Sequence, residues 1–239
     1  MITLSCETST LLGSVAIHKN DQLLAERNLM RQGSHSDSLN LMIEDCLAES
    51  KLTLHQVDVF SCGIGPGSFT GIRISINTIK TFAYVYNKPC SVVDSLENLA
   101  ALNMQLNSQH NSQKTEHLVC AINAYKNMLY IAEYRLDKNK QLEIIQPPQV
   151  IRIQNLSSFI KNPVIFIGDG YESYKNYIDQ NFSHLILRPD WISDFPKASV
   201  TGEISFNRQK FLPWSELLPT YLRASEAEEN LNGIKYQPL

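Results

Sequence analysis

The sequence of 239 residues lacks several patterns that mark common classes of protein. Its five cysteines include no Cys-x-x-Cys pair and lie far apart, which favours buried, reduced thiols over a disulfide framework. No apolar run approaches the roughly 20 residues that a membrane-spanning helix needs. The N-terminus also has no basic segment followed by a long apolar one, as a secretory signal would. We therefore expect a cytoplasmic protein that makes no contact with a membrane.

An excess of positive charge is missing as well. The chain has 21 lysines and arginines against 24 aspartates and glutamates, a net charge of −3 and a pI of about 6.1. Such a chain has no basic field that would recruit nucleic acid by itself. If RNA is the substrate, we expect a partner to supply most of the positive charge.

The patterns for metal binding and nucleophilic catalysis do not occur either. The six histidines include no pair spaced i, i+4 on a predicted helix, and there is no His-Glu-x-x-His. Ser68 superficially resembles a nucleophile elbow, but Gly-x-Ser-x-Gly requires glycines where this chain has Pro66 and Thr70. We expect no metal, no cofactor and no catalytic residue in this chain.

What the sequence does have is a glycine-rich stretch, Gly-Ile-Gly-Pro-Gly-Ser-Phe-Thr-Gly at residues 63–71. It joins an apolar strand predicted at 57–64 to an apolar helix predicted at 68–86. Glycine and proline make up five of its nine residues. The backbone is therefore expected to turn sharply there and to pass close to a ligand or to another part of the chain. A turn of this kind presents backbone N–H groups at a helix N-terminus, where anions bind.

The stretch fits neither common nucleotide-binding motif. Ile72-Arg73 follows Gly71 where the P-loop motif requires Lys-Ser/Thr, and Thr70 stands where the third glycine of Gly-x-Gly-x-x-Gly would fall. Two interpretations remain open: the turn holds phosphates, or it packs the helix tightly onto the sheet. The residues alone slightly favour packing.

A second polar cluster, Glu-Thr-Ser-Thr at residues 7–10, follows the first predicted strand. A carboxylate and hydroxyls there would suit a cation with phosphates, and an ordinary polar turn fits equally well. We expect any nucleotide site to be vestigial and to draw on both clusters: Glu7, Thr8, Gly65, Gly67, Ser68, Thr70 and Gly71.

Hydrophobic periodicity predicts two related α/β lobes, the second one reduced. In the first, strands are predicted at 2–6, 13–18, 23–29, 57–64 and 90–93, with helices at 36–49, 68–86 and from 94 or 95 to about 106. In the second, strands are predicted at 118–122, 128–135, 142–146, 164–167 and 185–187, with helices at 171–180 and 197–207. The predicted domains are a first lobe at 1–106, a polar linker at 107–117, a second lobe at 118–223 and a flexible acidic tail at 224–239.

Several motifs together resemble one family. They are Leu-Ser-Cys-Glu-Thr-Ser-Thr at 4–10, His-Ser-Asp at 35–37, the glycine-rich stretch continued to residue 74, Asp-Ser-Leu at 94–96, Ile-Gly-Asp-Gly at 167–170 and Pro-Thr-Tyr-Leu-Arg at 219–223. These residues closely resemble the TsaB family, formerly YeaZ, of bacterial subunits for the biosynthesis of N6-threonylcarbamoyladenosine in tRNA. The likeness covers most of the chain and is strongest over residues 1–105.

The resemblance implies an α/β fold of the actin-like ATPase class (ASKHA, RNase H-like), with a complete first lobe and a reduced second one. It also implies a non-catalytic scaffold or activator, which supports formation of the modified nucleoside beside the anticodon of tRNAs that read codons beginning with A. Its implied partners are the catalytic paralogue TsaD, bound as a heterodimer, and the ATPase TsaE. Contact with tRNA is implied only through the complex, and a homodimer when the chain is alone.

This sequence departs from the family pattern at three positions. Glu7 stands where the family usually has aspartate, while Asn123 and Asn127 replace an aspartate and a glycine of the second-lobe pattern Asp-Ala-Arg-x-Gly-Glu-x-Tyr. These changes argue further against independent ATP hydrolysis by this chain.

The predicted helix at 36–49 is our candidate for the partner interface. It is carried by His35, Leu39, Leu41, Met42, Ile43 and Leu47, with part of the apolar stripe in the core and Leu41, beside Ala48, facing a partner. The alternative is that the whole stripe belongs to the core. Two other functions stay open: an ATP-dependent phosphotransferase using Glu7, Thr8 and the turn at 65–71, and, with less support, a protease.

Overall fold

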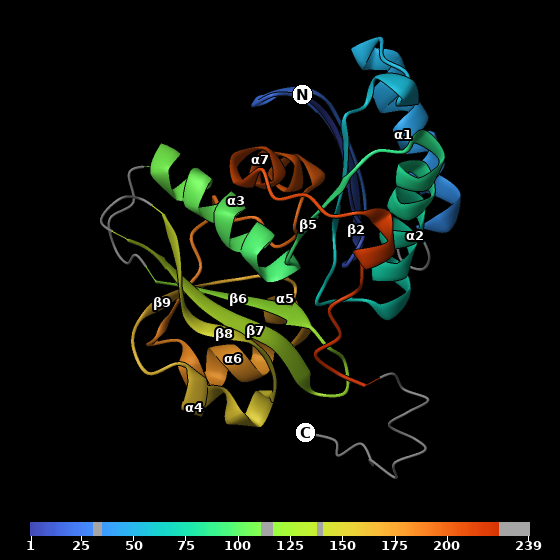
Figure 1. The fold of residues 1–239 in the computed structure, drawn as a ribbon. Coiled ribbons are helices and arrows are strands. Elements are labelled where there is room, and N and C mark those ends of the chain that lie inside the picture. Colours follow the sequence, from blue (N-terminus) through green and yellow to red (C-terminus); the bar gives the residue numbers. More distant parts are fainter. Residues whose placement is uncertain (31–34, 111–116, 138–140, 225–239) are drawn as a thin grey trace. The chain divides into compact units, whose positions relative to one another are not determined.

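The computed structural model describes residues 1–30, 35–110, 117–137 and 141–224 (Figure 1). The chain forms two compact units, the first comprising Met1–Asn98 with Phe195–Thr220 and the second Leu99–Asp194 with Tyr221–Leu239. This division differs from the predicted one at 1–106 and 118–223. The segment Phe195–Thr220 belongs to the first unit because its helix, Ala198–Arg208, packs on the sheet of that unit. No local sequence pattern reveals this contact.

The first unit contains a five-stranded sheet, sheet A, in the order β3-β2-β1-β4-β5. The first three strands form an antiparallel meander, and β4 and β5 run parallel to β1. Its strands are β1 (Ile2–Glu7), β2 (Leu12–Lys19), β3 (Gln22–Met30), β4 (Val59–Gly63) and β5 (Cys90–Val93). Its helices are α1 (Ser36–Ser50), η1 (Leu54–Gln56), α2 (Phe69–Tyr86), α7 (Ala198–Arg208) and η3 (Trp214–Glu216). The unit boundary falls inside α3 (Ser95–Gln109).

One face of sheet A is apolar and carries α1 and α2. Leu4 and Cys6 of β1 join Val15 and Ile17 of β2 in a core that also includes the inner stripes of both helices. The predicted stripe of α2, namely Ile72, Ile76, Ile79 and Ala83, is buried there. These predicted helices are therefore confirmed, and their stability comes from burial of an apolar face.

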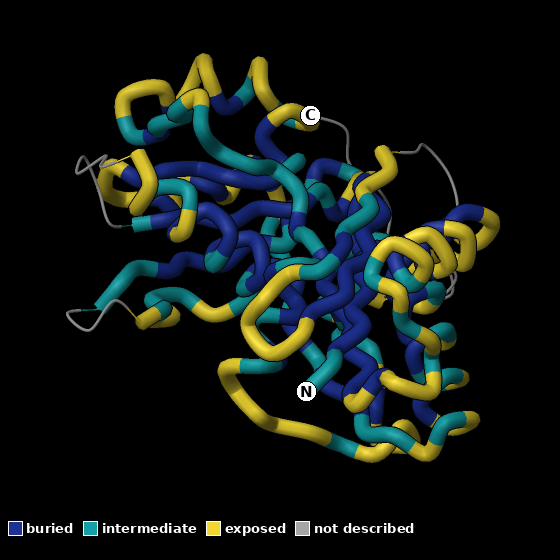
Figure 2. The backbone as a smooth tube through the Cα atoms, turned by 90° about the horizontal axis from the view of Figure 1, so that it is seen from above, coloured by how far each residue is buried: buried dark blue, intermediate teal, exposed yellow. Residues whose placement is uncertain are grey.

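The other face of sheet A is polar, yet it is equally buried. Ser5 alternates with Leu4 and Cys6 along β1, and it lies in register with Ser61 of β4, which in turn is in register with Ser91 of β5. Helix α7 covers this face: the N–H of Ala198 donates to Ser14 Oγ of β2 at 2.8 Å. Small side chains allow α7 to approach the sheet closely, so Ser5 and Ser61 on this face are as buried as Leu4 and Cys6 on the other. Figure 2 colours such buried residues dark blue along the backbone.

The second unit contains sheet B, in the order β10-β9-β6-β7-β8. Strands β6, β7 and β8 form an antiparallel meander, and β9 runs parallel to both β6 and β10. Its strands are β6 (His117–Asn123), β7 (Met128–Leu136), β8 (Leu142–Arg152), β9 (Val164–Ile167) and β10 (Ile186–Leu187). Its shorter helices are η2 (Ile153–Asn155), α4 (Leu156–Phe159), α5 (Gly170–Ser173) and α6 (Lys175–Phe182).

Three predicted boundaries in this part of the chain are corrected. Strand β8 does not end before Pro147-Pro148 but runs through them, because β8 is an edge strand and its ladder to β7 shifts register there. The helix predicted at 171–180 is two helices, since Tyr174 has a φ of −129°, outside the helical region. The predicted linker at 107–117 is helical up to Gln109 and begins β6 at its last residue.

The rest of that linker, residues 111–116, lies outside the described residues, as does the predicted tail after residue 224. All five cysteines are buried and free, as predicted. Burial raises the pKa of Cys46 and of Cys90 to about 11, so these thiols are poor nucleophiles.

The polar face of sheet A generates a stability prediction. Ser5 Oγ is buried and has no hydrogen-bond partner among the described residues, whereas Ser14 Oγ accepts a bond from the first residue of α7. We expect Ser5→Ala to leave the free energy of unfolding unchanged or to raise it by up to about 1 kcal/mol. Ser14→Ala should lower it by about 1 kcal/mol or more, because the Ala198 N–H loses its partner.

Urea denaturation of the two variants and the parent chain measures both effects. An equal loss of stability in the two variants would contradict the assignment of Ser5 as an unsatisfied hydroxyl.

Candidate functional site

The glycine-rich turn lies in the first unit, between the end of β4 and the start of α2. Helix α2 begins at Phe69, and the Oγ of its N-cap Ser68 accepts a hydrogen bond from the Gly71 N–H at 3.2 Å. The peptide bond between Gly65 and Pro66 is cis. The predicted strand–turn–helix arrangement of this stretch is therefore present.

The turn packs against the end of β1 in its own unit. Thr8 Oγ1 donates to the Gly71 carbonyl oxygen at 2.7 Å, and the Ser68 N–H donates to the Ser9 carbonyl oxygen at 2.7 Å. A Cβ atom on Gly71 would lie only 2.0 Å from the Thr8 carbonyl oxygen. The close approach that glycine permits at this position is therefore used by residues 8–9 of the same chain.

Glu7, the last residue of β1, sits behind this contact with no exposed surface. Its Oε1 accepts the Ser9 N–H at 2.7 Å, and its Oε2 accepts the Ser95 hydroxyl at 3.3 Å. Burial raises the pKa of the Glu7 carboxyl, and the hydrogen bonds from Ser9 and Ser95 offset only part of this rise. Burial thus disfavours the charged form of this carboxyl, which is the form that binds a metal ion.

A second carboxyl, Asp94, lies next to Ser95 at the start of α3. Its Oδ1 accepts the N–H groups of Leu96 and Glu97 at 2.9 and 3.1 Å and so caps the helix. Burial raises the pKa of Asp94 to about 6. Among the described residues, no three His, Cys, Asp or Glu side chains are grouped so that they could hold a metal ion.

The structure thus brings Glu7, Thr8, Ser68 and Gly71 together. Gly65 joins this group through its carbonyl oxygen, which accepts the Ser95 N–H at 2.8 Å, and Thr70 is exposed on the first turn of α2. Sequence reasoning missed the contact between Glu7 and Ser95. The two residues are 88 positions apart, and no local pattern connects them.

The predicted interface residues divide into two groups. Leu39, Met42 and Ile43 of α1 are at most 7% exposed and belong to the core of the first unit, and Leu47 packs partly against that core. His35, the N-cap residue of α1, is buried, and its Nε2 lies 3.0 Å from the Thr10 carbonyl oxygen. Leu41 is different, with 61% of its surface exposed.

Comparisons with known proteins connect this geometry to a family. The family model described as TsaD, tRNA N6-adenosine threonylcarbamoyltransferase, matches residues 29–231. The chain belongs to this threonylcarbamoyltransferase family. It is 26% identical over 234 residues to the tRNA threonylcarbamoyladenosine biosynthesis protein TsaB of Bacillus subtilis (strain 168), covering 95% of this chain and 96% of that protein. To the TsaB of Escherichia coli (strain K12) it is 27% identical over 243 residues, covering 98% and 99%.

A solved structure confirms the fold class that the sequence predicts for this chain. YeaZ from Pseudomonas aeruginosa superposes with a TM-score of 0.73 at 23% identity, covering 92% of this chain and 99% of that one. The resemblance to TsaB and YeaZ drawn from the motifs is therefore confirmed as well. Within the described residues no helix is both long enough and apolar enough to cross a membrane.

The departures from the threonylcarbamoyltransferase-family pattern in the second unit lie on the β6–β7 turn. Tyr125, Lys126 and Asn127 all have positive φ, at 58°, 51° and 60°. Asn127, which replaces a glycine of the pattern, is a residue type that tolerates this conformation. The other departure, Asn123, accepts the Tyr125 N–H on its Oδ1 at 2.8 Å and donates its own N–H to Asp169. The backbone conformation at Asn127 and the hydrogen bonds of Asn123 thus account for both asparagines without a bound nucleotide.

The contact between Glu7 and Gly63 generates a coupling prediction. A Cβ atom on Gly63 would lie 1.8 Å from Glu7 Oε2, so Gly63→Ala should lower the free energy of unfolding by about 1–3 kcal/mol through overpacking. Glu7→Asp withdraws the carboxyl by one methylene, so the double variant should lose less stability than the sum of the two single variants. We expect a coupling of about 1 kcal/mol in a double-mutant cycle measured by denaturation. Strict additivity would contradict this geometry.

Glu7 also generates a pH prediction. Because its pKa is raised in the folded state, the folded protein keeps the Glu7 proton at pH values where the unfolded chain, with a pKa of about 4.3, has lost it. The contribution of Glu7 to the free energy of unfolding should therefore fall as pH rises above about 4.3.

Glu7→Gln keeps both hydrogen-bond partners and carries no titrating proton. Its stability relative to the parent should increase from pH 4 to pH 7, as measured by denaturation across that range. Glu44→Gln, which removes an exposed carboxyl from α1, is the matched control. The same pH trend in both variants would contradict a special role for Glu7.

Proposed function

We propose that this chain is a non-catalytic subunit that supports the formation of N6-threonylcarbamoyladenosine in tRNA, and that it acts by binding a catalytic TsaD-type paralogue. The observation that carries the proposal is the near full-length likeness to proteins named for threonylcarbamoyladenosine biosynthesis. Membership of the threonylcarbamoyltransferase family supports the same pathway.

The geometry of the glycine-rich turn supports a structural rather than a catalytic role. The Thr8 carbonyl oxygen occupies the space in front of Gly71, and Glu7 is fully buried, which raises the pKa of its carboxyl. A phosphotransferase would need an ionised, accessible carboxylate to bind the metal–nucleotide complex. We therefore favour the scaffold over the phosphotransferase, and no observation on the described residues favours a protease.

Helix α1 is the proposed surface for the catalytic paralogue. Its inner stripe holds it to sheet A, while Leu41 and Ala48 are exposed seven positions apart and form an outer strip flanked by the exposed Glu44 and Asp45. A helix fixed in this way presents a rigid strip, which lowers the entropic cost of binding. We propose that the same strip allows a homodimer when the paralogue is absent, and that a TsaE-type ATPase joins the complex. With a net charge of −3, the chain contacts tRNA through its partners.

Reconstitution of tRNA modification tests this proposal. A purified TsaD-type paralogue, the ATPase and the remaining pathway components are assayed with and without this chain, and we expect the modified nucleoside to form only when it is present. Leu41→Glu should weaken binding to the paralogue by at least tenfold, because it places a charge in an apolar contact. Leu23→Glu on β3, where Leu23 is 44% exposed, is the matched control and should change neither binding nor modification.

Two outcomes would contradict the proposal. Modification that proceeds equally well without this chain would exclude the supporting role. Unchanged binding by Leu41→Glu would exclude α1 as the interface while leaving the supporting role to the reconstitution assay.

A further inference from the structure

A buried histidine lies beneath α7 in the first unit, and the proposed function does not use it. His18, near the end of β2, has no exposed surface and is in register with Thr3 of β1. Side chains alternate along a strand, so His18 shares the polar face of sheet A with Ser14, four positions earlier. Neither ring nitrogen of His18 has a hydrogen-bond partner among the described residues. Most buried polar groups are paired, so this histidine calls for an explanation.

Helix α7 passes directly over the His18 ring. A Cβ atom on Gly202 of α7 would lie 2.4 Å from His18 Nδ1 and 2.7 Å from its Cε1. The same Cβ atom would lie 3.1 Å from Ser5 Oγ of β1. Glycine at position 202 therefore lets the helix backbone rest against the ring, and α7 shields this part of the sheet.

The charged group that acts on His18 is Glu26 of β3. Its Oε1 accepts the Ser199 N–H of α7 at 3.2 Å, which places the carboxylate on the α7 side of the sheet. Burial lowers the pKa of His18 below its ordinary value, and attraction to Glu26 offsets only part of this effect. The charged imidazolium is therefore disfavoured while α7 is in place.

The other elements around His18 do not compensate for this burial. Strand β1 faces it with Thr3 and Ser5, which carry no charge. The remaining charged residues on β1, β2, β3 and α7 are Glu7, Lys19, Arg27, Glu203 and Arg208. Of all the charged groups on these four elements, only Glu26 shifts the pKa of His18.

A charge on His18 acts on α7 more than on the rest of the unit. The opposite face of sheet A is held by burial of apolar side chains, which carry no titrating group. On the α7 side the helix is held by hydrogen bonds such as the one from Ala198 to Ser14. Release of α7 gives the imidazolium access to water without breaking the strand ladders of β2.

We propose that α7 is a pH-sensitive element, which is docked on sheet A while His18 is neutral and is released in mild acid when His18 takes up a proton. A solvated histidine has a pKa of about 6.5, so the released form binds the proton that the docked form resists. By linkage, docking has its full stability above about pH 6.5 and weakens as the pH falls below that value. The scaffold role rests on α1, on the other face of the sheet, so either proposal can fail without the other.

Two buried carboxyls titrate in the same range with the opposite sign. Burial raises the pKa of Asp94 and of Asp169 to about 6, so the folded protein binds their protons more tightly than the unfolded chain does. Acidification therefore stabilises the folded state through these two groups. A loss of protection in α7 at low pH requires a group whose pKa is lowered by folding, as that of His18 is.

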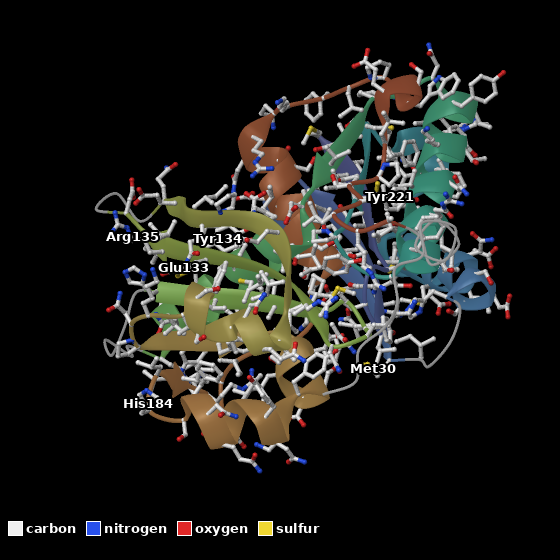
Figure 3. The ribbon with its side chains drawn as sticks, turned by 90° about the horizontal axis from the view of Figure 1, so that it is seen from below. Met30, Glu133, Tyr134, Arg135, His184 and Tyr221 are labelled. Atoms are coloured by element: carbon white, nitrogen blue, oxygen red, sulfur yellow. The ribbon has the colours of Figure 1, made fainter. Side chains whose placement is uncertain are left out.

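Hydrogen exchange of the full-length chain, followed by mass spectrometry at pH 7.5 and pH 5.5, tests this proposal. After correction for intrinsic exchange rates, protection in α7 should fall several-fold, up to the roughly tenfold that a group of pKa about 6.5 allows over this interval. Protection in α2, on the apolar face, should change by less than about twofold. His18→Gln carries no titrating proton and should abolish the fall in α7. His184→Gln, at an exposed position labelled in Figure 3, is the matched control and should keep it.

Unchanged protection of α7 in the parent chain would overturn the proposal. An equal fall in α7 and α2 would overturn it too, because the whole unit would then be opening, and so would the same fall in His18→Gln. An NMR titration of the His18 ring in the parent chain decides the case if His18→Gln does not fold. We expect a midpoint below about 6.5, and a midpoint at or above that value would contradict the role of His18.

Discussion

The first unit depends on the contact between the end of β1 and the glycine-rich turn. Four elements meet there: β1 ends at Glu7 and is followed by Thr8, β4 leads into the turn, α2 begins at it, and α3 begins beside it at Ser95. The bonds from Thr8 to Gly71 and from Ser95 to Glu7 are both buried. Burying a carboxyl costs free energy unless hydrogen bonds satisfy it, and Glu7 has such bonds, while burial raises the pKa of its carboxyl.

Sheet A shows how two buried faces can be stabilised differently. The face under α1 and α2 is apolar, so these helices are held mainly by the hydrophobic effect. The face under α7 carries serines, and α7 is held by close approach and by bonds such as Ala198 to Ser14. This difference determines which of these helices could be placed on the sheet from the sequence. The stripe of α2 identifies that helix at once, whereas α7 is weakly amphipathic, and its docking on sheet A cannot be deduced from its own residues.

At the candidate site, too, local features could be predicted from the sequence and long-range contacts could not. The turn, its two flanking elements and the capping of α2 follow from local chemistry, because glycine, proline and serine impose backbone geometry within a few residues. The group that fills the space in front of Gly71 cannot be deduced locally, since Thr8 follows the end of β1 and is 63 positions away in the sequence. In the second unit, His117 is the last residue of a stretch without apolar side chains, and such a stretch predicts a loop. Its place at the start of β6 depends on partners across the sheet.

The packing of the turn gives the glycine motif a structural role that does not depend on nucleotide chemistry. At Gly71 the side chain is excluded by the Thr8 carbonyl oxygen, and at Gly63 by the Glu7 carboxyl, so both contacts lie within the fold. A chain that keeps these contacts must keep its glycines whether or not it binds a phosphate. The motif therefore reports on how α2 and β1 are joined. For the function, the more informative feature is one that the fold does not require, the exposed Leu41 on α1.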